Sequence, residues 1–134
     1  MHRDMPVRVR HIVREDASAW EMMRLELWPD GAADHAPEIA SFFAGTLLEP
    51  TAVMVAENGD GVLFGFVELS IRTDVPGLRG RRAAYVEGLY VSPEVRHGGI
   101  AKKLLQASRK WARQQECDAF ASDRAGRIII DRSF

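Results

Sequence analysis

The residues with the clearest chemical potential lie in one stretch, EGLYVSPEVRHGGIAKKLL, residues 87–105. In it a strand-like apolar run meets Ser-Pro, then a basic turn with glycines, then an apolar pattern at helical spacing. A turn that enters a helix presents unpaired backbone N–H groups and the positive end of the helix dipole. Gly98 and Gly99 allow close approach of the backbone to a ligand and Arg96 adds a cation, so the stretch predicts a phosphate or pyrophosphate site.

The spacing of this turn matches neither the P-loop GxxxxGK[ST] nor the dinucleotide motif GxGxxG, so ATP and NAD are disfavoured as ligands. The simplest alternative is an ordinary surface turn in which glycine starts a helix. The residues alone leave both interpretations open.

Composition narrows the class of protein. The 134 residues, 46% of them hydrophobic and 28% charged, fit one globular domain. A net charge of -1 gives no basic field for nucleic acid. The single cysteine, Cys117, and the absence of zinc-ligand spacing predict neither an intrachain disulfide nor a metal site. No apolar run suits a signal peptide or a membrane span, so we expect a cytoplasmic protein that contacts no membrane.

The elements that must position this turn follow from periodicity and turn residues. A helix is expected after Asp16 or Ser18, with Glu21 completing a capping box, and a hairpin is expected around the Asn-Gly-Asp-Gly turn at 58–61. The predicted strands cover residues 6–14, 51–57, 62–72, 83–91 and 117–123, and the predicted helices cover 18–28, 35–48 and 98–115. This order predicts an α/β or α+β sandwich with a partly antiparallel sheet.

The pattern V-x-P-x-x-R-x-x-G-x-A, formed by Val91, Pro93, Arg96, Gly99 and Ala101, resembles the acetyl-CoA pyrophosphate loop of the GCN5-related N-acetyltransferase (GNAT) superfamily. Segments RLELWPD (24–30), GFVELSIR (65–72), YVEGLYVSPEVRHGGIAKKLL (85–105) and FASD (120–123) together resemble the aminoglycoside 6'-N-acetyltransferases. The resemblance covers about residues 7–123. It implies a single acetyltransferase domain over 1–134 with the GNAT fold, a mixed, mostly antiparallel sheet flanked by helices.

The same resemblance implies acetyl-CoA as cosubstrate. Its pantetheine arm would enter between the strands at 83–91 and 118–122, and a main-chain N–H near residues 89–91 would face the thioester carbonyl. The residues that this resemblance assigns to the cosubstrate are Leu89, Tyr90, Val91, Arg96, His97, Gly98, Gly99, Ile100 and Ala101.

For the acceptor, the resemblance implies that Asp123 is an acidic base near the reactive amine and that Glu87 binds this amine. Trp28 would stack on a sugar ring, and Asp30 or Asp34 would contact distal amines. An ammonium cannot attack a thioester, so one carboxylate close to the amine suffices as base. Each residue has a structural alternative: a solvated strand charge for Glu87, a helix-end core residue for Trp28, a helix N-cap for Asp123, and a solvated loop for Asp30 and Asp34.

The chain departs from the family after residue 123. Residues 124–134, RAGRIIIDRSF, do not resemble the helix and strands that normally follow, so we expect a truncated or frame-shifted end. Ile128, Ile129 and Ile130 could add a strand to their own sheet or to a partner's, which predicts a homo-oligomer, with a dimer expected. The loop at 73–77 also lacks a tyrosine common in the family. Two alternatives to aminoglycoside acetylation therefore stay open: a GNAT enzyme for another small or peptide amine, and a noncatalytic acetyl-CoA-binding remnant.

Overall fold

The computed structural model describes residues 7–96, 98–124 and 127–132, and within them the strands form one six-stranded sheet in the order β1-β2-β3-β4-β5-β6. Neighbouring strands are antiparallel except β4 and β5, which are parallel. The strands are β1 (Arg8–His11), β2 (Ala52–Glu57), β3 (Leu63–Arg72), β4 (Ala83–Val91), β5 (Ala119–Arg124) and β6 (Arg127–Asp131). The expected mixed, mostly antiparallel sheet is confirmed.

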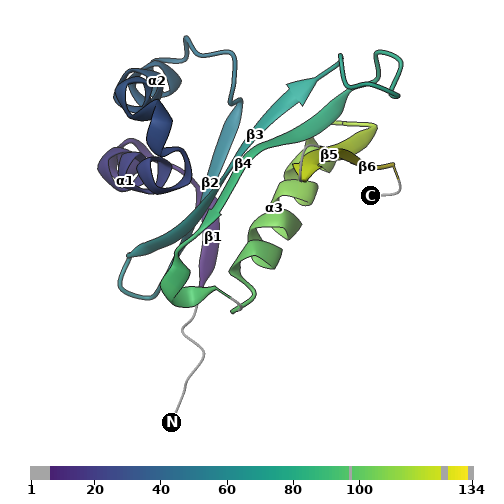
Figure 1. Ribbon diagram of the computed structural model, residues 1–134. Helices are drawn as coiled ribbons and strands as arrows, with labels where there is room; N and C mark the ends of the chain where they lie inside the picture. Colours follow the sequence, from purple (N-terminus) through teal and green to yellow (C-terminus); the bar gives the residue numbers. More distant parts are fainter. Residues whose placement is uncertain (1–6, 97, 125–126, 133–134) are drawn as a thin grey trace.

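Helices cover both faces of this sheet. Helices α1 (Ala17–Leu27) and α2 (Ala32–Ala44) lie on one face, and α3 (Ile100–Gln114) lies on the other (Figure 1). Alternation along β2 explains the two layers, because Met54 packs toward the core that contains Leu104 of α3, whereas Val53 and Val55 pack toward Trp20 of α1. The central strands are therefore buried on both faces.

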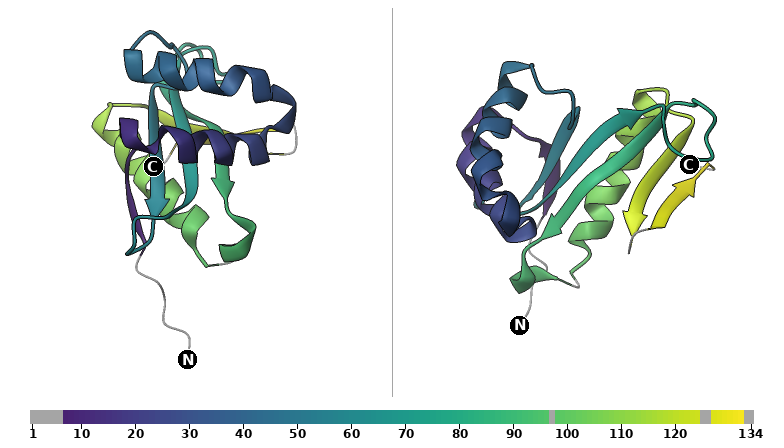
Figure 2. Two further views of the ribbon diagram at one scale, coloured as in Figure 1. Left: turned by 90° about the vertical axis from the view of Figure 1, so that its left-hand side faces the viewer. Right: turned by 45° about the horizontal axis from the view of Figure 1, so that its top comes forward.

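The pairing of β4 is irregular on both of its sides. The strands pair only from Ala83 to Val86 of β4, and beyond this point they diverge (Figure 2, right). In the same place Glu68 pairs with Gly88 while Leu69 pairs with Val86, which leaves Glu87 as the extra residue of a β-bulge. A bulge bends its strand and turns successive side chains to one face. The sheet thus opens on one side of β4 where Glu87 and Gly88 face the α1–α2 layer.

The helix boundaries correct two expectations. Residues 14–16 form a 3-10 turn that runs directly into α1 at Ala17, so the Ser18–Glu21 capping box is wrong. Asp16 instead accepts a hydrogen bond from the Val13 N–H and pairs with Arg10. Helix α2 spans 32–44 rather than 35–48, because Gly45, with φ of 75°, ends it in the left-handed conformation that favours glycine.

The end of the chain joins its own sheet. Strand β6 pairs antiparallel with β5, and Ile130 packs against the small core formed by Val75, Leu78, Ala83, Ala119 and Ala121. Of the two pairings expected for residues 128–130, the structure has the one within the chain. Among the described residues, no helix combines the length and apolar character needed to cross a membrane.

Candidate active site

A pocket of about 390 Å³ lies between the α1–α2 layer and the middle of the sheet. Its lining residues are Arg24, Trp28, Gly31, Asp34, His35, Glu38, Glu49, Pro50, Glu68 and Glu87. Five of these are carboxylates and one is an arginine, so the pocket favours a cationic guest.

One buried ion pair supports the floor of this pocket. Arg24 is 4% exposed and Glu68 is 2% exposed. The Arg24 Nε and Nη2 atoms donate to the two Glu68 oxygens at 2.7 and 2.8 Å, and Trp20 Nε1 donates to Glu68 Oε2 at 3.0 Å. Burial acts to lower the pKa of Arg24, but hydrogen bonds and charge from Glu68 and Glu38 outweigh burial and raise it. Arg24 Nη1 also donates to Glu38, so one guanidinium pairs with two carboxylates and the pocket keeps a negative charge.

Trp28 forms an aromatic wall at the point where α1 ends. Its backbone N–H donates to the Arg24 carbonyl at 2.7 Å, and its carbonyl lies 2.9 Å from His35 Nε2. The Arg24 guanidinium lies 5.4 Å from the centre of its ring, and a Cβ on Gly88 would come within 2.4 Å of the ring. The ring also packs against the core under α1 and α2. Trp28 is therefore both a helix-end core residue and part of the pocket surface.

Glu87 projects from the bulge into a close ion pair. Arg72 Nε and Nη2 donate to its two oxygens at 2.7 and 2.8 Å, and Arg72 Nη2 also lies 3.4 Å from Glu49 Oε2. The Glu87 hydrogen bonds, more than its charge, raise the pKa of Arg72 although burial opposes them. The Glu87 side chain is 17% exposed, so a freely solvated charge is the wrong description.

Asp123 lies within β5, so the helix N-cap alternative is wrong. Ala121 of β5 pairs with Tyr85 of β4, and the two side chains pack in one small core on the same face of the sheet. Side chains two residues apart in a strand share a face, so Asp123 lies on the face that carries Tyr85 and Glu87. Burial raises the pKa of Tyr85, and the negative charge of Asp123 raises it further. Asp123 is exposed.

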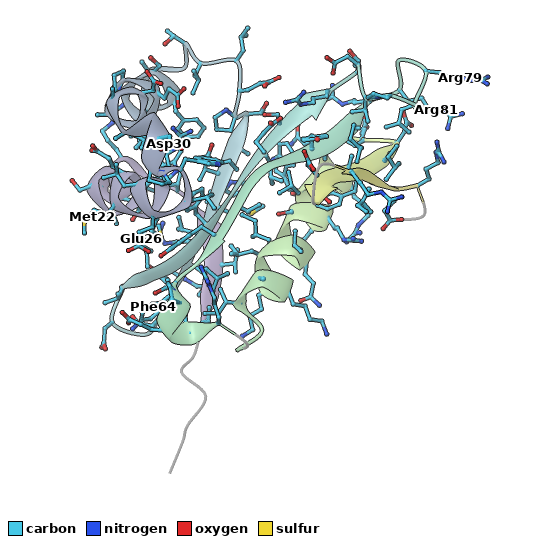
Figure 3. All side chains as sticks on the ribbon, in the orientation of Figure 1. Met22, Glu26, Asp30, Phe64, Arg79 and Arg81 are labelled. Carbon is cyan, nitrogen blue, oxygen red and sulfur yellow. The ribbon has the colours of Figure 1, made fainter. Side chains whose placement is uncertain are left out.

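Only some of the residues predicted to bind the acceptor line the pocket. Asp34 lines it, whereas the described lining residues include neither Asp30 nor Asp123. Asp30 is exposed on the short turn between α1 and α2, and Figure 3 labels it there. The structure therefore groups Trp28, Asp34 and Glu87 around the pocket and leaves Asp30 and Asp123 outside it.

The turn before α3 has the backbone form of an anion site. Gly99, with φ of 82°, precedes the helix, and the first helical hydrogen bond runs from the Lys103 N–H to the Gly99 carbonyl at 3.0 Å. The amides of Ile100, Ala101 and Lys102 therefore precede the helical ladder. A Cβ on Gly98 would lie 3.1 Å from the Val95 carbonyl oxygen, so the turn is tight there as well.

The other residues predicted to bind the cosubstrate lie on different faces of the sheet and differ in exposure. Arg96 is exposed, and its Nε donates to the Val91 carbonyl at 3.1 Å. Leu89 and Val91 pack against the α3 side of the sheet, whereas Tyr90 is buried on the opposite side with its hydroxyl on Glu26. Burial, followed by the Glu26 hydrogen bond, raises the pKa of Tyr90 to about 12. His97 lies outside the described residues.

Sequence reasoning did not identify several residues that line the pocket, Arg24, His35, Glu38, Glu49 and Glu68, or Arg72, which pairs with Glu87 beside it. The available signal was a charge within an apolar strand, since Glu68 interrupts GFVELSIR on the same face as Phe66. A buried charge of this kind requires a partner, which predicts an arginine elsewhere but does not say which one. Across the described part of the chain, no group of three His, Cys, Asp or Glu side chains is arranged to hold a metal.

Comparison with known families and proteins gives consistent results. The family model described as "Acetyltransferase (GNAT) family" matches residues 12–127. Aminoglycoside N(6')-acetyltransferase type 1 of Klebsiella aerogenes is 42% identical over 116 residues, which cover 86% of this chain and 76% of the relative. The enzyme of the same name from Stenotrophomonas maltophilia is 36% identical over 116 residues, covering 86% and 73%.

Solved structures of aminoglycoside acetyltransferases have the same fold over most of this chain. Aminoglycoside N-acetyltransferase AAC(6')-Iy in complex with CoA superposes with a TM-score of 0.80 at 29% identity, covering 93% of this chain and 81% of that chain. The same enzyme with the bisubstrate analogue CoA-S-monomethyl-acetylneamine gives 0.79 at 30% identity, covering 90% and 80%. AAC(6')-Ih of Acinetobacter baumannii gives 0.78 at 31% identity, covering 90% and 80%.

Proposed function

The chain belongs to the acetyltransferase (GNAT) family, and we propose that it transfers the acetyl group of acetyl-CoA to the 6'-amine of aminoglycoside antibiotics. The observation that carries this proposal is the acidic pocket walled by Trp28, which lies beside the point where β4 leaves β5. An aminoglycoside carries several ammonium groups on sugar rings, and carboxylates beside an aromatic face suit both features.

The residues of the chain fit the cosubstrate in two ways. The amides of residues 100–102 at the start of α3 would bind its phosphates, with Arg96 as an adjacent cation. Because β5 pairs with β4 only as far as Val86, backbone groups of residues 87–91 that face away from β3 are available to the pantetheine amides. The cosubstrate supplies an acetyl thioester, and a β4 backbone N–H would stabilise the negative charge that develops on its carbonyl oxygen.

Two carboxylates would handle the acceptor amine. Glu87, held by Arg72 at the bulge, would orient it, and Asp123 on the same face would take its proton as the carbonyl is attacked. Trp28 would stack on the sugar ring, while Asp34, Glu38 and Glu49 would bind the more distant ammonium groups. Asp30, outside the pocket, would contact only a part of the acceptor that extends beyond it.

The test measures thiol release from acetyl-CoA with tobramycin, beside a comparable aminoglycoside that carries a 6'-hydroxyl. We expect release only with the 6'-amine, and a fall of roughly 100-fold or more in kcat/KM for Asp123→Ala and Glu87→Ala. Glu15→Ala, which removes an exposed carboxylate in the 3-10 turn before α1, serves as the matched control. Release with any amine would favour a broader GNAT activity, and acetyl-CoA binding without release would favour a noncatalytic binding protein.

Assembly and location complete the proposal. We propose one acetyltransferase domain that forms homodimers, because the exposed Ile128 and Ile129 lie on the outer strand of the sheet. A cytoplasmic location is supported by the need for acetyl-CoA and by the single thiol, Cys117, whose pKa is raised by burial.

A further inference from the structure

Arg72 links two carboxylates of the acceptor pocket through one guanidinium. It donates to both oxygens of Glu87, lies 3.4 Å from Glu49, and stands 4.5 Å above the ring of Tyr85. Its side chain is 29% exposed and that of Glu87 17% exposed. Such a two-point contact fixes the plane of the carboxylate as well as its charge.

The charges around Glu87 are predominantly negative. On its own side stand Arg72 of β3, Tyr85 of β4, Asp123 of β5 and Glu49 before β2, with Asp74 near enough to act on Arg72. Across the pocket the charged or titratable groups are Asp34, His35, Glu38 and the Arg24–Glu68 pair. Such surroundings hold an amine as its ammonium, and the ammonium cannot attack an acetyl group.

We propose that Arg72 is a positioning residue for acetyl transfer, which orients Glu87 and offsets its charge so that the bound amine loses its proton more readily. The proposal rests on the function proposed above. A carboxylate offers about four lone-pair positions, and Arg72 occupies one on each Glu87 oxygen, so positions remain for the amine. Arg72 thus weakens acceptor binding somewhat and favours the reactive, neutral form of the amine.

Arg72→Gln separates these two effects. We expect the acceptor Kd to fall about 3- to 10-fold, because one positive charge is removed from beside the amine. We expect kcat near pH 7 to fall roughly 10-fold, because the rising limb of the pH profile moves up by about one unit. Above both apparent pKa values the amine is neutral in either enzyme, so the two kcat values should converge near about pH 10. Arg72→Lys keeps the positive charge, so the rising limb of its kcat profile should lie at the wild-type pH. It cannot restore the two-point contact with Glu87.

The experiment uses the full chain and two readouts. Isothermal titration of tobramycin in the presence of CoA, repeated in buffers of different ionisation enthalpy, gives the Kd and the protons taken up on binding. Thiol release from about pH 6 to about pH 10 gives the kcat profile. Arg81→Gln, an exposed arginine on the β3–β4 loop that Figure 3 labels, removes the same charge away from the pocket. Thermal unfolding of each variant checks that it is folded.

Tighter binding, greater proton uptake and a shifted profile in Arg72→Gln would support the proposal. A purely structural role predicts instead weaker binding and a uniform loss of kcat at every pH, and that result would overturn it. If the wild-type protein binds tobramycin without turnover, the proposed function fails while Kd and proton uptake still decide the role of Arg72. If it binds no tobramycin, both proposals fall.

Discussion

Gly88 is the residue at which the sheet meets the aromatic wall of the pocket. A Cβ at this position would come within 2.4 Å and 2.6 Å of two outer ring carbons of Trp28, so the ring lies directly on the glycine. The absence of a side chain at Gly88 lets one edge of the Trp28 ring pack against β4 next to Glu87. The identity of residue 88 therefore controls the shape of the acceptor site without any contact between its own side chain and a ligand.

Gly88→Ala should displace the Trp28 ring and impair acceptor binding selectively. We expect the KM for tobramycin to rise roughly 10-fold or more, because a wall that shifts by about an ångström no longer matches the sugar. The Kd of acetyl-CoA, measured by titration, should change less than about twofold, since the α3 turn is untouched and the substitution keeps the N–H and C=O groups of residue 88. An equal loss of affinity for both ligands would contradict this role.

Gly65→Ala provides a matched comparison at the residue scale. Its new Cβ would lie 2.6 Å from the Tyr90 carbonyl oxygen, and a backbone atom in a paired strand cannot move as a ring can. This variant should lose thermal stability, whereas Gly88→Ala should keep most of it. The contrast separates a glycine that shapes the pocket from one that the sheet itself requires.

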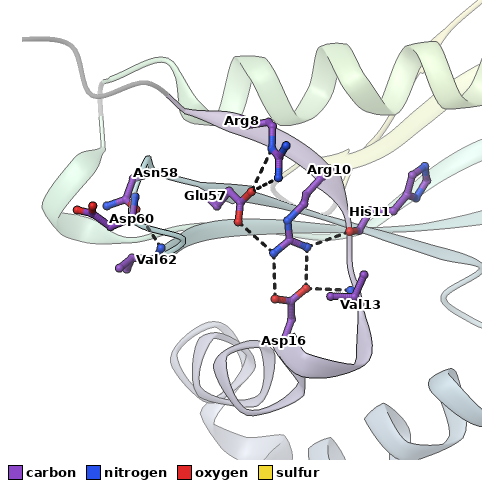
Figure 4. Close-up of polar contacts among 9 residues, drawn as sticks. All are labelled: Arg8, Arg10, His11, Val13, Asp16, Glu57, Asn58, Asp60 and Val62. Atoms are coloured by element: carbon purple, nitrogen blue, oxygen red, sulfur yellow. Dashed lines mark hydrogen bonds and ion pairs between the residues drawn. The ribbon is translucent and has the colours of Figure 1, made fainter.

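At the scale of elements, a network of charges ties β1 to the start of α1 (Figure 4). Arg10 donates to both Asp16 oxygens at 2.8 and 3.0 Å and to Glu57 at 3.1 Å, while Arg8 donates to the other Glu57 oxygen. Asp16 also accepts from the Val13 N–H at 2.8 Å. The carboxylate thereby orients the turn between β1 and α1, and through it the helix that carries Arg24 and Trp28.

Asp16→Asn should destabilise the fold by about 2 kcal/mol near neutral pH, because Arg10 loses a buried, charged partner. The Arg10 hydrogen bonds, aided by the Val13 N–H, hold the pKa of Asp16 below its usual value although burial opposes them. A lowered folded pKa means that this contribution is complete above the unfolded pKa, about 4, and disappears as pH falls through the folded value. Urea unfolding of both proteins between about pH 7 and about pH 3 should therefore show a difference that shrinks only at the acid end.

Asp60→Asn, in the exposed β2–β3 turn, is the control for the loss of a carboxylate and should change stability by less than about 0.5 kcal/mol. A wild-type to Asp16→Asn difference that stays constant to the lowest pH would show that the carboxylate charge is not what stabilises the turn.

Sequence reasoning succeeded where the determinants are local. The hairpin around residues 58–61 and the turn before α3 follow from glycines and periodicity within about twenty residues, and both are confirmed. The acidic pocket could not be predicted in the same way, because it joins Arg24, Glu38, Glu49, Glu68 and Glu87 from five separate segments. Only the pairing of strands and the packing of α1 on β3 bring these charges together. The bulge at Glu87 was equally hidden, since it depends on the register between β3 and β4.

At the scale of the whole molecule, the two outer strands of the sheet differ in character. β1 reads Arg-Val-Arg-His, a short strand whose basic side chains oppose pairing with a second sheet. On β6, Ile128 is 42% exposed and Ile129 is 49% exposed. Within the described part of the chain β6 has a strand partner on one side, so its other side offers backbone groups and apolar surface to a second copy.

Ile129→Lys should therefore convert a dimer into a monomer. Light scattering coupled to size exclusion should give about twice the 15.0 kDa chain mass for the wild type and the single-chain mass for the variant, because a buried lysine opposes association across the edge. Met22→Lys, at a residue 69% exposed on α1, adds the same charge at another apolar position and should leave the dimer intact. A monomeric wild type, or a dimer that survives in Ile129→Lys, would rule out association through β6. Retained acetyl transfer in the monomeric variant would further show that each chain builds its own site, as expected from a pocket formed by α1, α2, the segment before β2, β3 and β4 of one chain.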